Sequence, residues 1–167
     1  MAEDLGEYSE GVAKLLKDTN LPGMKVLQFA FDGSGSGNAF LPHNYNENCV
    51  AYLGTHDNDT IVGWWNGLSD ELRTYVYNYT GFESGYEIHR KMMKLLSRSK
   101  ADTVIFTMQD VLGMDSTRRM NVPGTVSRDN WTFMLKDNEF TDGNVDYLAT
   151  ITALFARNPE KRENEND

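Results

Sequence analysis

The chain has 167 residues, of which 40% are hydrophobic and 25% are charged, and its formal net charge is −9. This composition predicts one soluble globular domain, and the acidic balance argues against nucleic acid or an anionic membrane as partner, because both attract positive patches. No apolar run approaches the roughly 18 residues of a membrane span. The single cysteine, Cys49, cannot form an internal disulfide, and the N-terminus shows no signal-peptide pattern, so we expect a cytoplasmic protein.

The first part of the chain alternates a predicted helix and a predicted strand. Residues Glu7 to Thr19 predict a helix with Ser9 as its cap and with a buried apolar stripe of Val12, Leu15 and Leu16. Met24 to Phe31 is apolar almost throughout, which predicts a buried strand. The glycine-rich segment Asp32–Asn38 predicts a flexible loop. It lacks the Gly-Lys-Ser/Thr ending of a phosphate-binding loop, so we reject that function for it.

A polar segment, Gly54–Thr60 (GTHDNDT), follows the apolar run Cys49–Leu53 and precedes a predicted helix from Thr60 to Leu68. This order is typical of a buried parallel strand that ends at a functional loop. Asn, Asp, Gly and Thr are also the ordinary residues of a solvated turn. Two carboxylates and one imidazole at the end of a strand favour a site, because their placement there costs free energy unless the groups are used.

The second half of the chain predicts three helices and one further strand. In chain order these are a helix from Asp70 to about Tyr79 capped by Ser69, a basic helix from Tyr86 to Ser99, a buried strand from Asp102 to Met108 with a loop at Gln109–Asp115, and a helix from Val145 to Arg157. The basic helix should turn Ile88, Met92, Leu95 and Leu96 inward. Its charged face fits a solvated surface better than a calmodulin or lipid site. The charged tail Asn158–Asp167 should fray.

This alternation predicts an α/β fold with a parallel sheet. Polar loops after the strands suit a (β/α)8 barrel, in which the sites lie on the loops that follow the strands. Such a barrel has eight strands and typically about 250 residues, whereas only three strands are predicted here. We therefore expect the chain to form part of such a barrel and not the whole of it.

Five motifs stand in order along the chain: Ala2–Gly6 (AEDLG), Leu21–Phe31 (LPGMKVLQFAF), Leu41–Tyr45 (LPHNY), Gly54–Thr60 (GTHDNDT) and Arg119–Thr125 (RMNVPGT). Together they resemble the C-terminal part of the amylomaltases, the 4-α-glucanotransferase (disproportionating enzyme) family, which is related to the α-amylases. The resemblance extends from Ala2 to the terminal helix. It implies that residues 1–157 form the C-terminal part of a (β/α)8 barrel, roughly its strands 6 to 8 with their helices. It implies a retaining enzyme that needs no cofactor or metal and that transfers α-1,4-glucan segments to the 4-hydroxyl of an acceptor sugar.

The resemblance also implies roles for individual residues. Glu3 would be the catalytic acid/base, and Asp57 would stabilise the oxocarbenium-like transition state. His56 and Asn121 would bind the same sugar, and Phe29 would line the glucan groove. The retaining mechanism needs two carboxylates about 5 Å apart, one of which is a nucleophile. From its position alone, Glu3 could equally be an exposed acid near the start of the chain.

The sequence departs from the family pattern in two places. The family's nucleophile is an aspartate in an Arg-x-Asp motif, and no such motif occurs in the 167 residues. Met134 ends the segment Asn130–Met134, where the family usually carries Asn-Trp-x-x-Arg, so the role of that arginine is lost. We therefore expect little or no transferase activity from this chain alone.

Two other functions remain to be weighed against the transferase. A non-catalytic, glucan-binding half would pair with itself or with the missing N-terminal barrel half, because an incomplete barrel exposes a strand edge and an apolar face. A metal-dependent hydrolase would use His56, Asp57 and Asp59, but these are too few ligands at too tight a spacing. Trp64 and Trp65 fit helix packing better than sugar binding.

Overall fold

The computed structural model describes residues 1–6 and 9–158. Its elements in chain order are α1 (Glu10–Thr19), β1 (Gly23–Val26), the 3-10 turns η1 (Leu27–Ala30) and η2 (Pro42–Asn44), β2 (Cys49–Tyr52), α2 (Ile61–Gly67), α3 (Asp70–Thr80), α4 (Ile88–Ser97), β3 (Thr103–Ile105), α5 (Met108–Val111), η3 (Ser116–Arg118) and α6 (Asp142–Leu154). No described helix is both long and apolar enough to cross a membrane. Most of the predicted tail, residues 159–167, lies outside the described part.

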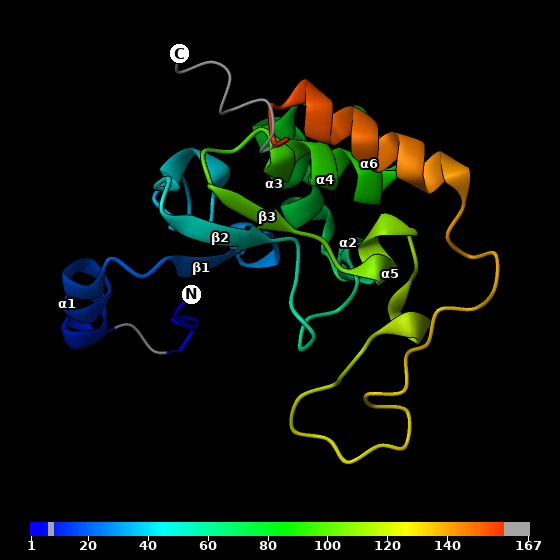
Figure 1. Ribbon diagram of the computed structural model, residues 1–167, viewed down its shortest axis with the longest axis horizontal. Coiled ribbons are helices and arrows are strands. Elements are labelled where there is room, and N and C mark those ends of the chain that lie inside the picture. Colours follow the sequence, from blue (N-terminus) through cyan, green and yellow to red (C-terminus); the bar gives the residue numbers. More distant parts are fainter. Residues whose placement is uncertain (7–8, 159–167) are drawn as a thin grey trace.

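The three strands of the described residues form one parallel sheet in the order β1-β2-β3 (Figure 1). The strands end at the same level, because Val26 is paired with Tyr52 and Tyr52 with Ile105. Long crossover connections join successive strands, as parallel pairing requires. Residues 27–48 with the 3-10 turns η1 and η2 lead from β1 to β2, and the helices α2, α3 and α4 lead from β2 to β3. The prediction of an α/β fold with a parallel sheet is therefore confirmed.

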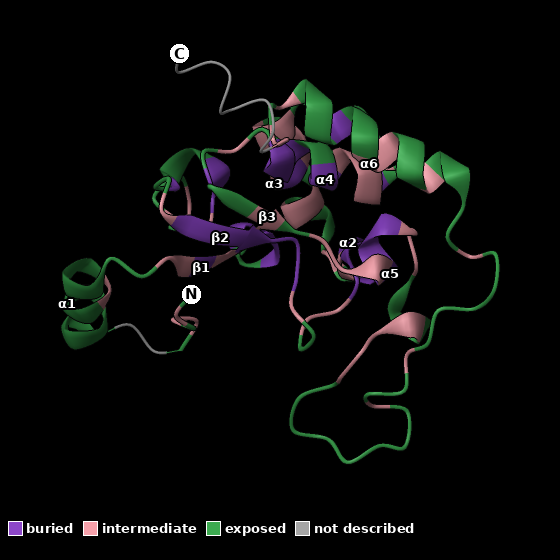
Figure 2. Cartoon of the chain, in the orientation of Figure 1, coloured by how far each residue is buried: buried purple, intermediate pink, exposed green. Residues whose placement is uncertain are grey.

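The central strand β2 is buried along its whole length, and its side chains alternate between the two faces of the sheet. Cys49 and Ala51 belong to the main core, which lies between the sheet and the helices α2, α3 and α4 (Figures 1 and 2). Val50 and Tyr52 face the other way and form a smaller apolar cluster with Met24, against which Leu5 packs. The sheet thus has one face covered by helices and a second face that carries a short apolar strip.

Aromatic rings fill much of the main core. Phe31 is buried and contacts Trp64, Tyr75 and Tyr79, with ring centroids 5.6–5.9 Å apart. Trp65 is only 7% exposed and packs edge-on against Tyr77. The interpretation of both tryptophans as packing residues is therefore confirmed.

The predictions from local signals agree with the structure for two helices. The inward stripe predicted for α4 is buried at all four positions, namely Ile88, Met92, Leu95 and Leu96. The hydroxyl of Ser69 accepts a hydrogen bond from the Leu72 N–H, so Ser69 caps α3 as predicted.

Helix α1 differs from the prediction. Ser9 does cap it, since its Oγ accepts from the Val12 N–H, but no residue of α1 is buried and Leu15 is 61% exposed. The helix projects beyond the sheet (Figure 1), and of its apolar stripe Val12 and Leu15 are exposed whereas Leu16 is half-buried. Glu7 and Tyr8, where we expected the helix to begin, lie outside the described part.

Two predicted strands are shorter than expected. β1 ends at Val26, because the Gln28 N–H donates to the Leu53 carbonyl and the chain turns into η1, which buries Leu27 and Ala30. β3 covers only Thr103–Ile105, and it is exposed on alternate residues because it is an edge strand of the described sheet. The expected loop at Gln109–Asp115 begins instead as the short helix α5.

Candidate active site

The loop Gly54–Thr60 leaves the carboxyl end of β2 and leads into α2. A Cβ at Gly54 would lie 2.7 Å from Gln28 Nε2, so a larger residue would displace the Gln28 side chain from beneath this turn. The side chain of Asn58 closes the turn, because its Oδ1 accepts from both the backbone N–H and the hydroxyl of Thr55, each at 2.9 Å. Thr60 then caps α2 by accepting from the Gly63 N–H. The polar residues of this segment thus fix its shape.

Side chains from other elements hold the end of the loop. The Gln28 side-chain amide donates to the Asp59 carbonyl at 2.7 Å, and the Ser116 hydroxyl donates to the Asp59 carboxylate at 2.6 Å. The buried Asp110 carboxylate accepts from the Ile61 N–H at 2.7 Å. Asp59 is therefore a structural residue of the loop, with its carboxylate engaged away from Asp57.

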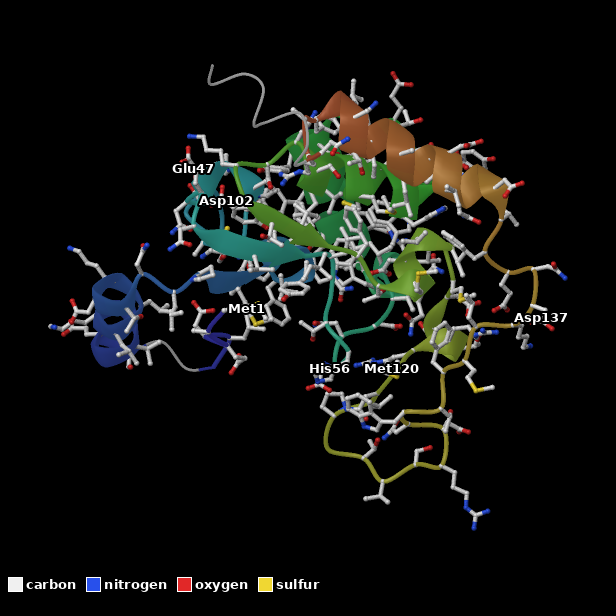
Figure 3. All side chains as sticks on the ribbon, in the orientation of Figure 1. Met1, Glu47, His56, Asp102, Met120 and Asp137 are labelled. Carbon is white, nitrogen blue, oxygen red and sulfur yellow. The ribbon has the colours of Figure 1, made fainter. Side chains whose placement is uncertain are left out.

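The side chains of His56 and Asp57 stand at the outer end of the loop, 57% and 48% exposed. His56 Nε2 lies 3.5 Å from Asp57 Oδ1, and Asn121 Nδ2 donates to the same oxygen at 2.7 Å. Arg119 links the two segments, since its guanidinium donates to the backbone carbonyls of Asp57 and Asn121 at 2.6 and 2.8 Å. The structure therefore brings Asn121 to the His56–Asp57 pair. Figure 3 shows His56 near Met120, the residue between Arg119 and Asn121.

A groove of about 1010 Å³ runs along the uncovered face of the sheet beside this loop. Its walls include Glu3, Phe29, His56 and Asp57, four of the five residues singled out from the sequence. Its other lining residues are Met1, Leu5, Gly6, Met24, Tyr52, Gly54, Thr55, Asn58, Ile105, Phe106, Thr107 and Pro123. The fifth singled-out residue, Asn121, reaches the groove through its bond to Asp57.

The N-terminal segment carries Glu3 to the groove by pairing with the start of β1. The Ala2 N–H donates to the Pro22 carbonyl at 2.9 Å, and the Asp4 carboxylate accepts from the Met24 N–H at 2.7 Å. A Cβ at Gly23 would lie 2.6 Å from the Asp4 carboxylate, so a larger residue there would displace the Asp4 side chain. Glu3 itself is exposed, and its carboxylate accepts from the Leu5 N–H at 2.7 Å.

A second cavity of about 300 Å³ lies behind the loop and contains Asp110, which the sequence analysis did not single out. Asp110 is 1% exposed, and this burial raises the pKa of its carboxyl to about 6, with a further contribution from the charge of Asp59. The hydrogen bond from Ile61 opposes the rise. An acid directly after an apolar strand was the available signal, since strand ends carry the sites of parallel sheets.

The segment that departs from the family pattern lies beyond Asn121. The Met134 side chain is exposed, and its carbonyl accepts from Arg118, which also pairs with Glu139 at 3.0 Å. Trp131 in the same segment stands with its ring centroid 5.1 Å from that of His56, a neighbour that the sequence pattern did not indicate. No group of three or more His, Cys, Asp or Glu residues that could hold a metal ion occurs in residues 1–6 and 9–158.

Comparisons with known proteins agree on one family. The family model for 4-alpha-glucanotransferase matches residues 1–139. The 4-alpha-glucanotransferase of Synechocystis sp. is 46% identical over 158 residues, covering 94% of this chain and 31% of the relative. The chloroplastic/amyloplastic 4-alpha-glucanotransferase of Oryza sativa is 46% identical over 155 residues, covering 93% of this chain and 26% of the relative.

A solved structure also matches the chain. The amylomaltase from Streptococcus agalactiae in complex with acarbose matches with a TM-score of 0.88 and 35% identity, covering 93% of this chain and 31% of that one. The chain thus spans about a third or less of the length of these relatives. The chain belongs to the 4-alpha-glucanotransferase family.

Proposed function

We propose that the groove is part of the active site of a 4-alpha-glucanotransferase that transfers α-1,4-glucan segments with retention of configuration. One observation carries the proposal: Glu3 and Asp57, which belong to different loops, line the same groove. The family membership supports the reaction class, and the groove's mixture of aromatic and polar walls suits an oligosaccharide.

In the proposed reaction, a carboxylate nucleophile attacks the anomeric carbon of the donor sugar while Glu3 gives its proton to the departing glycosidic oxygen. In the second half, Glu3 takes the proton of the acceptor 4-hydroxyl, whose oxygen then attacks the anomeric carbon and releases the nucleophile. Asp57, held by Asn121, would stabilise the positive charge that develops on the sugar ring. The 167 residues contain no Arg-x-Asp motif, so the nucleophile would come from residues outside them.

We further propose that the sheet belongs to a (β/α)8 barrel, roughly its strands 6 to 8. The partner would be the remainder of that barrel, or failing that a second copy of this chain. The exposed edge of β3 and the uncovered stripe of α1 support such pairing, since both would be covered in a closed barrel. Sedimentation velocity of the chain at micromolar concentration, alone and mixed with the preceding part of the Synechocystis relative, tests this. A monomer in both experiments would contradict it.

We also propose a reducing compartment such as the cytoplasm. Cys49, the only cysteine in the sequence, is a buried free thiol whose pKa is raised by its burial, so the chain is suited to reducing conditions. Localisation of the tagged chain in its native cell would test this.

The decisive experiment joins this chain behind the residues that precede the matching segment in the Synechocystis relative. The fusion should convert maltotriose to glucose and longer maltodextrins, whereas the 167 residues alone should not. Glu3→Gln and Asp57→Asn should each lower kcat by at least about a thousandfold, as expected for residues that act in the transition state. Glu71→Gln, which changes an exposed carboxylate of α3, is the matched control and should retain full activity. Full activity of the Glu3 variant would refute the assignment.

A further inference from the structure

Trp131 is an exposed tryptophan beside the candidate site. Its side chain is 62% exposed, whereas Trp64 and Trp65 both pack in the main core. An indole is among the largest apolar groups in a protein, so its exposure forfeits much hydrophobic stabilisation. Exposed aromatic rings next to polar groups are common at binding surfaces, and this one stands at the mouth of a site.

The backbone of Trp131 is held in a conformation that a bulky residue seldom adopts. Its φ is +63°, in the left-handed region that favours glycine. Two neighbouring contacts fix this conformation: the Trp131 N–H donates to the Met120 carbonyl at 2.7 Å, and the Asn130 side chain accepts from the Val122 N–H at 3.2 Å. Strain of this kind persists where the surroundings enforce it, and it clusters at ligand-binding positions.

The same contacts fix the indole relative to the loop Gly54–Thr60. The Met120 carbonyl accepts from the Trp131 N–H, and the next residue, Asn121, donates its side-chain amide to the Asp57 carboxylate. On the other side, the indole lies against His56, with ring centroids 5.1 Å apart and a 39° angle between the planes. The indole, the imidazole and the Asp57 carboxylate thus form one connected surface.

This surface has the chemistry of a sugar subsite. A glucose ring presents an apolar face of C–H bonds and a rim of hydroxyl groups. The indole offers a flat apolar partner for the face, while the half-exposed His56 and Asp57 offer hydrogen-bond partners for the rim. We propose that Trp131 is a stacking platform for one glucose unit of an α-1,4-glucan, placed next to His56 outside the groove. This inference rests on the substrate class in the proposed function.

Binding of maltoheptaose to the purified chain tests the platform without any need for turnover. Calorimetry gives the Kd, and tryptophan emission with iodide quenching reports on the exposed indole. Maltoheptaose should shift the emission and protect Trp131 from iodide. Trp131→Gly removes the ring while suiting the positive φ, so the loop is not strained by the change. It should raise Kd roughly three- to tenfold, and Trp131→Phe, which keeps a ring, should stay within about twofold of the wild type.

The matched control is Tyr86→Ala, which removes an exposed aromatic ring that does not line the groove. It should leave both Kd and the protection from iodide unchanged. Two results would overturn the platform and leave the proposed function standing. One is binding of maltoheptaose without a shift in tryptophan emission, and the other is a Trp131→Gly variant that binds maltoheptaose as tightly as the wild type. No heat of binding at millimolar maltoheptaose would overturn the platform, whereas the maltotriose assay of the fusion tests the proposed substrate class separately.

Discussion

The buried carboxyl of Asp110 should make the stability of this protein depend on pH in a way that one substitution removes. Burial raises the pKa of Asp110 from 3.8 to about 6. The folded state therefore binds this proton more tightly than the unfolded state. The stabilisation is fully present below the unfolded pKa, near 4, and is lost as pH rises through about 6. A shift of about two units corresponds to about 3 kcal/mol between these limits.

Asp110→Asn isolates this effect. The amide has no charge to bury, and its oxygen can still accept from the Ile61 N–H that the carboxylate holds at 2.7 Å. Urea unfolding followed by tryptophan fluorescence at pH 4 to 8 gives the free energy of unfolding of both proteins. The variant should gain about 3 kcal/mol relative to the wild type between pH 4 and 7.5. Asp102→Asn, at an exposed carboxylate, should keep the wild-type profile. A constant difference between wild type and Asp110→Asn across this range would refute the reasoning.

Two further substitutions probe the loop and its partners. Gly63→Ala would place a Cβ 2.2 Å from the Ser116 hydroxyl, and it should lower the free energy of unfolding, measured in urea, by about 1–3 kcal/mol. The control is Gly67→Ala in the same helix. Its Cβ meets no atom within 4 Å, so it should not lower the free energy of unfolding. Equal effects at the two glycines would contradict this packing argument. Asn121→Ala removes the amide that donates to Asp57 and should lower the transfer rate of the fusion roughly tenfold, measured as glucose release from maltotriose. An unchanged rate would show that the amide does not support this carboxylate.

Helix caps and apolar stripes were predicted correctly where they depend only on residues close together in the sequence. The stripe of α4 and the caps Ser9 and Ser69 depend on residues three or four apart, which the sequence displays directly. The burial of α1 could not be predicted in the same way. Its apolar stripe shows which side favours a partner, but whether anything covers that side depends on segments distant in the chain.

Some residues of the candidate site could likewise be identified from the sequence pattern and others could not. His56 and Asp57 stand in one contiguous motif, so the sequence displayed them, whereas Glu3 and Asn121 were identified only through the resemblance to a family. Their position at one groove is a tertiary fact that no periodicity encodes. Asp110 was missed because its partner is the Ile61 N–H, across the end of the sheet and far away in the sequence.

The register of the sheet explains why the loop's supports come from such distant positions. Val26, Tyr52 and Ile105 are level with one another at the carboxyl ends of their strands. Gln28, whose amide donates to the Asp59 carbonyl of the loop, lies two residues beyond the end of β1. Asp110 lies in α5, which begins soon after the end of β3. A slip of one residue in either pairing would move these side chains to the wrong face or level. The geometry of His56 and Asp57 therefore depends on strand register as much as on their own motif. Substitutions that disturb the pairing of β1 or β3 should impair the site even where the changed residue does not line the groove.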